Sequence, residues 1–212
     1  MQKKYVLSAY SEPIMSDIFR TINGPAEAIY TEKRSKFLAF AYHVASVEEV
    51  KEIIAGLNKK YFDARHVCWA YMLGPERLEF RANDNGEPSG TAGKPILGQI
   101  NSYELTDILI AVVRYFGGVK LGTSGLITAY RQAARDAIEN AEIIECHRMK
   151  HLSFTFPYMA MNDVMKISRF DGVTVTGTTF DNTCLMELDI ELDRFDEIFN
   201  RLSDIDGVTM ND

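Results

Sequence analysis

The fold is decided by the stretch Ile108-Leu-Ile-Ala-Val-Val-Arg-Tyr-Phe-Gly-Gly-Val-Lys-Leu-Gly-Thr-Ser-Gly125. Its first six residues, 108–113, are an unbroken apolar run rich in β-branched side chains, which predicts a strand buried on both faces. The run ends before Gly117-Gly118, and from Leu126 to Asn140 apolar residues recur at helical spacing. The stretch therefore predicts a buried strand, a glycine-rich loop over 117–125 and a helix.

The predicted glycine-rich loop suggests an anion site. A loop between a strand and a helix frees backbone N–H groups at the positive end of the helix. We place Arg114 at the entrance of this loop and Lys120 inside it. The same glycines are also compatible with a tight turn that only permits positive φ and close helix packing. Gly117 and Gly122 have Walker A spacing, but Thr123 stands where that motif needs lysine, so we reject a P-loop NTPase.

Composition describes an ordinary globular chain. Its 212 residues allow one large or two small domains, and 46% apolar with 25% charged residues is typical of a soluble protein. No apolar run approaches the roughly 18 residues of a membrane span, and Met1–Ile14 lacks the pattern of a signal peptide. Cys68, Cys146 and Cys184 have no metal-ligand spacing, so we expect reduced thiols in a cytoplasmic protein.

Charge is distributed unevenly along the chain. The formal net charge of −7 argues against a general nucleic-acid binder. Residues 148–212 hold 6 Lys+Arg and 12 Asp+Glu, whereas residues 1–147 hold 17 and 18. We therefore expect any site for an anionic partner in the first part of the chain.

Periodicity divides the chain into an extension over 1–14, a first domain over 15–147 and a second domain over 148–212, with Met15 as an alternative start. In the first domain we expect two strands within Ala28–Val44, a helix from the capping box at Ser46 to about Lys60, a strand over 63–73 and its hairpin partner over 78–81. In the second domain we expect strands over 151–156, 172–176, 184–192 and 207–210, and helices opened by Pro157 and by Asp193 as a cap. This β-α-β-β-α-β order is the ferredoxin-like arrangement.

A second loop, Asn83–Pro95, is dense in turn-forming residues and leads into a short helix with Pro95 in its first turn. Ser89 or Thr91 is a candidate cap. A second helix start beside the first makes a shared binding face plausible, with Lys94 as a phosphate or carboxylate partner. Asp84 and Glu87 are candidates for paired carboxylates, which need convergent geometry for acid–base chemistry. For His66 beside Arg65 we favour a structural or hydrogen-bonding role over catalysis.

Two motifs resemble a known family. Glu87-Pro-Ser-Gly-Thr-Ala-Gly-Lys-Pro95 and Val113-Arg-Tyr-Phe-Gly-Gly-Val-Lys-Leu-Gly-Thr-Ser-Gly125 resemble the two signatures of the YigZ family, which shares its domain with eukaryotic Impact. Lys33-Arg-Ser-Lys-Phe37 and Arg65-His66 also fit, and Ser124 departs from the glycine of many members. The resemblance implies an α+β protein with an α/β two-layer sandwich similar to domain IV of elongation factor G, followed by a ferredoxin-like domain similar to domain V. Members are classed as regulators of translation under stress, and no established reaction accompanies the family.

Three functions are compatible with these observations. The first is a non-enzymatic protein that binds RNA or the ribosome through phosphates held by the loop 117–125, with Tyr115 or Phe116 stacking on a base. The second is a protein-interaction module, in which the acidic second domain meets a basic partner. The third is a phosphate-ester hydrolase that uses Asp84 and Glu87. We expect no metal, no cofactor and no membrane partner. The candidate binding residues are Arg65, His66, Asp84, Glu87, Ser89, Thr91, Lys94, Arg114, Tyr115, Phe116, Gly117, Gly118, Lys120, Gly122, Thr123 and Gly125.

Overall fold

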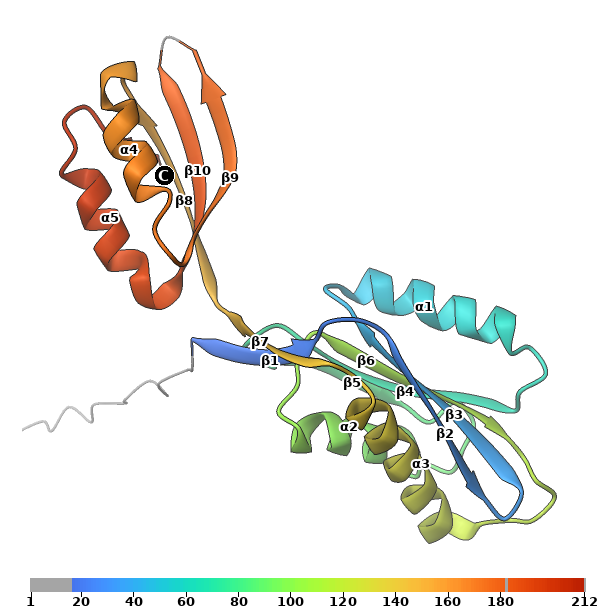
Figure 1. Ribbon diagram of the computed structural model, residues 1–212. Helices are drawn as coiled ribbons and strands as arrows, with labels where there is room; N and C mark the ends of the chain where they lie inside the picture. Colours follow the sequence, from blue (N-terminus) through green and yellow to red (C-terminus); the bar gives the residue numbers. More distant parts are fainter. Residues whose placement is uncertain (1–16, 182, 212) are drawn as a thin grey trace, which may run out of the picture.

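The computed structural model describes residues 17–181 and 183–211 (Figure 1). The expected extension over 1–14 and the alternative start at Met15 lie outside these residues. The described chain forms two units, each with its own sheet and its own hydrophobic core. The predicted α+β class is confirmed. Among the described residues, no helix is long and apolar enough to cross a membrane.

The first unit is built on a five-stranded antiparallel sheet in the order β2-β3-β6-β4-β5. Its strands are β2 (Ala26–Glu32), β3 (Ser35–His43), β4 (His66–Leu73), β5 (Glu79–Asn83) and β6 (Ile108–Tyr115). The central strand β6 is buried from Ile108 to Arg114, as the apolar run predicts. Because β6 has a strand on each side and helices above and below, its side chains are covered in every direction.

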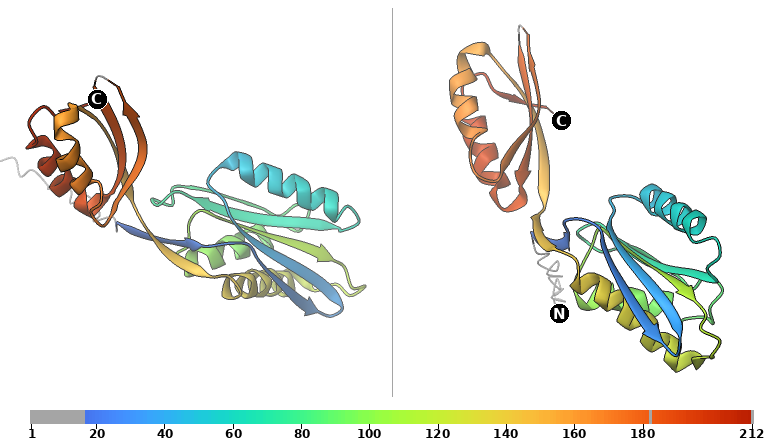
Figure 2. Two further views of the ribbon diagram at one scale, coloured as in Figure 1. Left: turned by 45° about the horizontal axis from the view of Figure 1, so that its top comes forward. Right: turned by 45° about the vertical axis from the view of Figure 1, so that its right-hand side comes forward.

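Helices cover both faces of this sheet. Figure 2 shows α1 (Val47–Lys60) on one face, and α2 (Gly93–Ser102) and α3 (Gly122–Glu139) on the other. Alternate residues of the sheet supply the two cores, so Phe37 packs with the α3 side and Phe40 with the α1 side. The unit thus has three layers, where two were expected, because the apolar residues of β6 alternate between two buried faces.

The capping box of α1 is confirmed. The N–H of Glu49 donates to Ser46 Oγ at 3.2 Å, and Glu49 Oε2 accepts from the N–H of Ala45 at 2.8 Å. The helix ends at Lys60, as predicted.

Two features of the first unit differ from expectation. Helix α3 begins at Gly122, so the last four residues of the predicted loop 117–125 belong to the first turns of the helix. The structure also contains β1 (Ile18–Ile22) and β7 (Ile143–His147), which the sequence patterns did not predict. These two strands pair with each other as an antiparallel ribbon outside the main sheet.

The second unit confirms the ferredoxin-like prediction. Its strands β8 (Met149–Phe156), β9 (Val173–Phe180), β10 (Cys184–Glu191) and β11 (Thr209–Met210) pair in the order β11-β8-β10-β9. The helices are α4 (Met161–Ile167) after the turn η1 (Tyr158–Ala160), and α5 (Phe195–Ser203) after the turn η2 (Leu192–Arg194). The expected cap at Asp193 is wrong: this residue lies within η2, and α5 has no side-chain cap.

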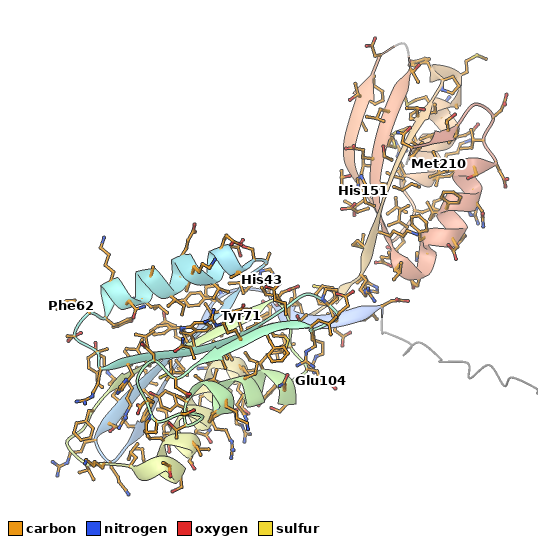
Figure 3. All side chains as sticks on the ribbon, turned by 180° about the vertical axis from the view of Figure 1, so that it is seen from behind. His43, Phe62, Tyr71, Glu104, His151 and Met210 are labelled. Atoms are coloured by element: carbon orange, nitrogen blue, oxygen red, sulfur yellow. The ribbon has the colours of Figure 1, made fainter. Side chains whose placement is uncertain are left out.

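Side chains fill the space between sheet and helices in both units (Figure 3). Tyr71 lies in this interior, whereas Phe62, in the connection after α1, points into solvent.

Candidate functional site

A pocket of about 440 Å³ lies where β6 ends and α3 begins. We call it the motif pocket, because residues of both sequence motifs line it. Its lining residues are Arg65, His66, Gly86, Glu87, Pro88, Arg114, Phe116, Lys120, Leu121, Gly122, Thr123 and Leu126.

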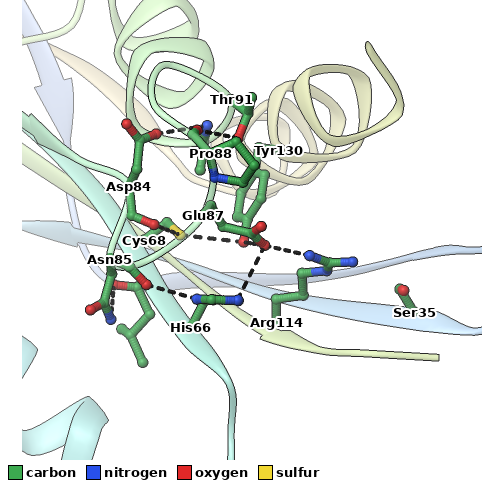
Figure 4. A network of polar contacts seen from close by, with 12 residues as sticks. Ser35, His66, Cys68, Asp84, Asn85, Glu87, Pro88, Thr91, Arg114 and Tyr130 are labelled. Atoms are coloured by element: carbon green, nitrogen blue, oxygen red, sulfur yellow. Dashed lines mark hydrogen bonds and ion pairs between the residues drawn. The ribbon is translucent and has the colours of Figure 1, made fainter. Parts of the chain in front are cut away.

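The floor of the motif pocket carries a buried ion pair. On the sheet, Arg114 of β6 stands directly opposite His66 of β4, and its guanidinium reaches the loop after β5. Its Nη1 donates to Glu87 Oε1 at 2.5 Å (Figure 4). Both side chains are almost fully buried, with residue exposures of 6% for Arg114 and 8% for Glu87. A buried carboxylate needs such a partner, because leaving its charge unpaired would cost several kcal/mol, on the order of 3–5.

His66 holds the same loop from the other side. Its Nδ1 lies 2.7 Å from the backbone oxygen of Asn85, and a carbonyl oxygen can only accept, so Nδ1 carries the proton and donates. This leaves Nε2 facing Glu87 Oε1 at 3.9 Å. The geometry agrees with the hydrogen-bonding role that we favour for His66.

Two protonated groups behind the pocket complete this network. Tyr130 of α3 donates its hydroxyl hydrogen to Glu87 Oε1 at 2.9 Å. The Cys68 sulfur lies 2.9 Å from the backbone oxygen of Asp84 and 3.3 Å from the Tyr130 hydroxyl. Burial raises the pKa of the Cys68 thiol to about 12 and raises the pKa of Tyr130 above its ordinary value. At neutral pH both groups are therefore donors and not nucleophiles.

Sequence reasoning missed Tyr130 and Cys68 as members of the network. A signal was present for Tyr130, because this residue stands in the apolar stripe of the predicted helix. A buried tyrosine hydroxyl usually has a hydrogen-bond partner.

Asp84 has a structural role that contradicts its predicted chemistry. Its carboxylate accepts the N–H groups of Gly90 at 2.8 Å, Ala92 at 2.9 Å and Gly93 at 2.8 Å. Burial alone would raise the pKa of this carboxyl, but the three donors outweigh it and hold the pKa below its usual value. Asp84 is thus fixed as an anion against α2, and it does not form an acid–base pair with Glu87.

The Asp84 carboxylate therefore already occupies the start of α2, where we expected a second anion site, and accepts the N–H groups of Ala92 and Gly93 there. The predicted caps are wrong as well. The hydroxyl of Thr91 donates to the backbone oxygen of Pro88 at 2.6 Å, Ser89 is exposed, and α2 has no side-chain cap at its own N-cap residue. Lys94 is exposed and does not line the motif pocket.

The glycine loop, 116–121, packs on the β2–β3 turn. The N–H of Gly117 donates to Ser35 Oγ at 3.2 Å, and a Cβ on Gly117 would lie 2.0 Å from the backbone carbon of Arg34. The N–H groups of residues 118–121 form no hydrogen bond with any described residue. The first turn of α3 follows, and such N–H groups have no acceptor within their own helix. Free donors therefore gather beside Lys120.

The motif pocket is positive on an acidic chain. Three cations line it, Arg65, Arg114 and Lys120, against the single carboxylate of Glu87. With His66 neutral, this leaves two positive charges, whereas the whole chain carries −7. Phe116 stands at the rim with 45% of its surface exposed, and its ring lies 5.7 Å from the Arg114 guanidinium carbon. Such a pocket is suited to an anionic ligand with an aromatic part.

The structure thus brings eight of the candidate residues together in the motif pocket: Arg65, His66, Glu87, Arg114, Phe116, Lys120, Gly122 and Thr123. Tyr115 points to the opposite face of the sheet, where its hydroxyl donates to Asp63 at 2.9 Å. Seven other candidates do not line the pocket: Asp84, Ser89, Thr91, Lys94, Gly117, Gly118 and Gly125. Among the described residues, no group of three or more His, Cys, Asp or Glu side chains is arranged to hold a metal ion.

Comparison with known proteins gives the following similarities. Residues 33–138 match the Impact N-terminal domain family. IMPACT family member YvyE of Bacillus subtilis is 34% identical over 141 residues, which cover 66% of this chain and 65% of that protein. IMPACT family member YigZ of Escherichia coli is 36% identical over 116 residues, which cover 54% of this chain and 57% of that protein. The chain thus spans less than two thirds of the length of these two relatives.

Two further similarities extend the comparison. An IMPACT family member encoded in the pol 5' region of Thermus thermophilus is 36% identical over 137 residues, covering 65% of this chain and 73% of that protein. A crystal structure of a hypothetical protein superimposes with a TM-score of 0.72 at 24% identity, covering 92% of this chain and 97% of that chain. This structural match shows that the two chains share a fold.

Proposed function

Since the chain belongs to the Impact N-terminal domain family, we propose that it is a non-enzymatic regulator of translation that binds RNA at the motif pocket. The observation that carries the proposal is the positive pocket beside backbone N–H groups that the chain's own carbonyls do not use. The family resemblance of its two motifs supplies the link to translation.

In this proposal, phosphate groups provide most of the affinity. Arg65 and Lys120 are exposed at the pocket and reach a phosphate directly, while the free N–H groups of residues 118–121 donate to its oxygens. Phe116 at the rim stacks on an unpaired base. Because phosphate contacts release counterions, binding weakens steeply as salt rises.

A hydrolase is less well supported than a binding protein. That hypothesis needs two carboxylates within reach of one substrate position. Glu87 does line the pocket. The carboxylate of Asp84, however, accepts hydrogen bonds from three N–H groups at and just before the start of α2, so it is not available to a substrate.

One observation supports a second candidate function, the protein-interaction module. Along β10, Glu187, Asp189 and Glu191 alternate with buried residues and therefore share the face of the sheet away from α4 and α5. This acidic face suits a basic partner. Glu187→Lys is expected to abolish capture of such a partner by the full chain while leaving RNA binding unchanged. Capture that survives this substitution would remove the candidate.

The RNA proposal is tested with a labelled single-stranded RNA oligonucleotide and fluorescence anisotropy. Lys120→Glu and Arg65→Glu are each expected to weaken binding about tenfold or more. Each should also reduce the slope of log affinity against log salt concentration by about one, which corresponds to the loss of one phosphate contact. Lys51→Glu is the matched control, because this exposed lysine lies on α1, on the other face of the sheet. Affinity that is unchanged in both pocket variants would reject the motif pocket as the RNA site.

A further inference from the structure

The motif pocket has charge and donors that suit one kind of phosphate better than another. Building on the proposed function, we infer that the pocket selects a phosphate monoester, the group found at the end of an RNA chain, over the phosphodiesters inside the chain.

The charge of the motif pocket matches a phosphate monoester. Arg65, Arg114 and Lys120 face the pocket, and only Glu87 opposes them. The charge of Glu87 is met by Arg114 and by the hydroxyl of Tyr130. A phosphodiester brings one negative charge and two free oxygens. A monoester brings about 1.5 to 2 negative charges at neutral pH and three acceptor oxygens. The two positive charges in excess match the monoester.

Arg114 has hydrogen-bond donors that no described residue uses. This side chain is 6% exposed, yet within the described part of the chain its guanidinium gives one hydrogen bond, from Nη1 to Glu87, and Nε gives none. Buried donors are nearly always satisfied, so an orphaned one calls for an explanation. A guanidinium binds phosphate oxygens through two parallel N–H groups. The first turn of α3, at Gly122 and Thr123, adds further donors and a positive helix end to the same pocket.

The shape of the motif pocket also favours a terminal phosphate. Apolar side chains of Pro88, Leu121 and Leu126 wall a volume of about 440 Å³. In this half-open hollow a terminal phosphate has one ester link to accommodate, whereas a phosphate inside the chain has two. The terminal nucleotide then places its base at Phe116 on the rim.

The test compares two ten-nucleotide RNAs of one sequence, labelled at the 3′ end, with a 5′ phosphate or a 5′ hydroxyl. By fluorescence anisotropy with the full chain, the phosphorylated RNA is expected to bind at least tenfold more tightly, because it gains charge-assisted hydrogen bonds. In Lys120→Gln and Arg65→Gln, this preference is expected to fall to within about twofold, while Lys51→Gln retains it. Thermal unfolding of each variant checks that the fold is kept.

Two competitors separate the sources of the monoester. Displacement of the labelled RNA by a nucleoside 5′-monophosphate supports the pocket as a monoester site that also accepts free nucleotides. Displacement by inorganic phosphate would show that the phosphate group is bound without its nucleoside. Equal affinity for both RNAs, together with no displacement by the nucleotide, overturns the inference. If those RNAs still bind and Lys120→Glu still weakens them, the proposed function survives that result. If neither RNA binds but the nucleotide does, directly and with sensitivity to Lys120→Gln, the proposed function fails and the monoester site stands.

Discussion

Asp84 acts as a remote cap of α2, and its removal tests that role directly. Its carboxylate accepts three N–H groups, at 2.8 Å, 2.9 Å and 2.8 Å. In Asp84→Ala all three donors lose their acceptor, and the N-cap residue of α2 offers no substitute. In Asp84→Asn one oxygen remains for Ala92 and Gly93, but the amide nitrogen faces the N–H of Gly90.

The magnitude follows from the number of donors. Loss of one helix cap costs about 1 kcal/mol, and a hydrogen bond to a charged group contributes about 1.5–3 kcal/mol. Asp84 is half-buried, so water replaces part of what the carboxylate provided. We expect Asp84→Ala to lower the free energy of unfolding by about 2–4 kcal/mol and Asp84→Asn by about 1–2 kcal/mol.

The effect must also depend on pH with a definite sign. Because the folded-state pKa of Asp84 lies below its usual value, ionised Asp84 stabilises the folded state above the unfolded pKa of about 3.9. That stabilisation is lost as the pH falls through the folded pKa. The difference between wild type and Asp84→Ala should therefore shrink at low pH.

Urea unfolding at pH 7 and near pH 3 measures both effects. Trp69, the single tryptophan, lies in β4 and reports on the first unit by its fluorescence. If the free energy of unfolding of Asp84→Ala stays within about 0.5 kcal/mol of wild type at pH 7, the range of ordinary surface substitutions, Asp84 does not cap α2. A difference that grows toward pH 3 would refute that role equally.

Two further predictions concern packing and thiol access. Gly117→Ala should destabilise the protein by about 2–4 kcal/mol, because its Cβ would meet the backbone of the β2–β3 turn at 2.0 Å. Gly98→Ala, in α2, should stabilise the protein by about 0.5–1 kcal/mol, because a Cβ there would meet no atom within 4 Å. Equal shifts of the two melting temperatures would contradict this contrast. At pH 8 a thiol reagent should label half-exposed Cys146 first. Buried Cys68 and Cys184 should react only on unfolding, and the pKa of Cys68 is in addition raised to about 12. Early labelling of Cys68, seen by mass spectrometry, would contradict the buried network.

Long periodic patterns made much of the fold predictable. The apolar run of β6 and the βαββαβ order of the second unit correspond directly to the structure. The start of α3 was misplaced because Gly-Thr-Ser-Gly is a poor helix sequence, which tertiary packing overrides. Strands β1 and β7 were missed because neither alternates apolar and polar residues: β1 reads Ile-Phe-Arg-Thr-Ile and β7 reads Ile-Ile-Glu-Cys-His.

The candidate site was predictable only in part. The residue types of the two motifs indicated an anion site, and the structure does bring Glu87, Arg114 and Lys120 into one pocket. The pairing of Arg114 with Glu87 was not predictable, because it depends on which face of β6 Arg114 occupies and on where the loop after β5 carries Glu87. The role of Asp84 was misread because the N–H groups that donate to it lie six to nine residues ahead, outside the spacing of any capping box.

The β1–β7 ribbon has a practical consequence for experiments. It joins the two ends of the first unit, from Ile18 to His147, at one place. Helix α3 runs from the motif pocket toward that ribbon over 18 residues, about 27 Å at 1.5 Å per residue. A tag or surface linker attached ahead of β1 therefore fixes the first unit at the end opposite the motif pocket. The pocket then faces away from the surface, so immobilised protein suits measurements with large ligands.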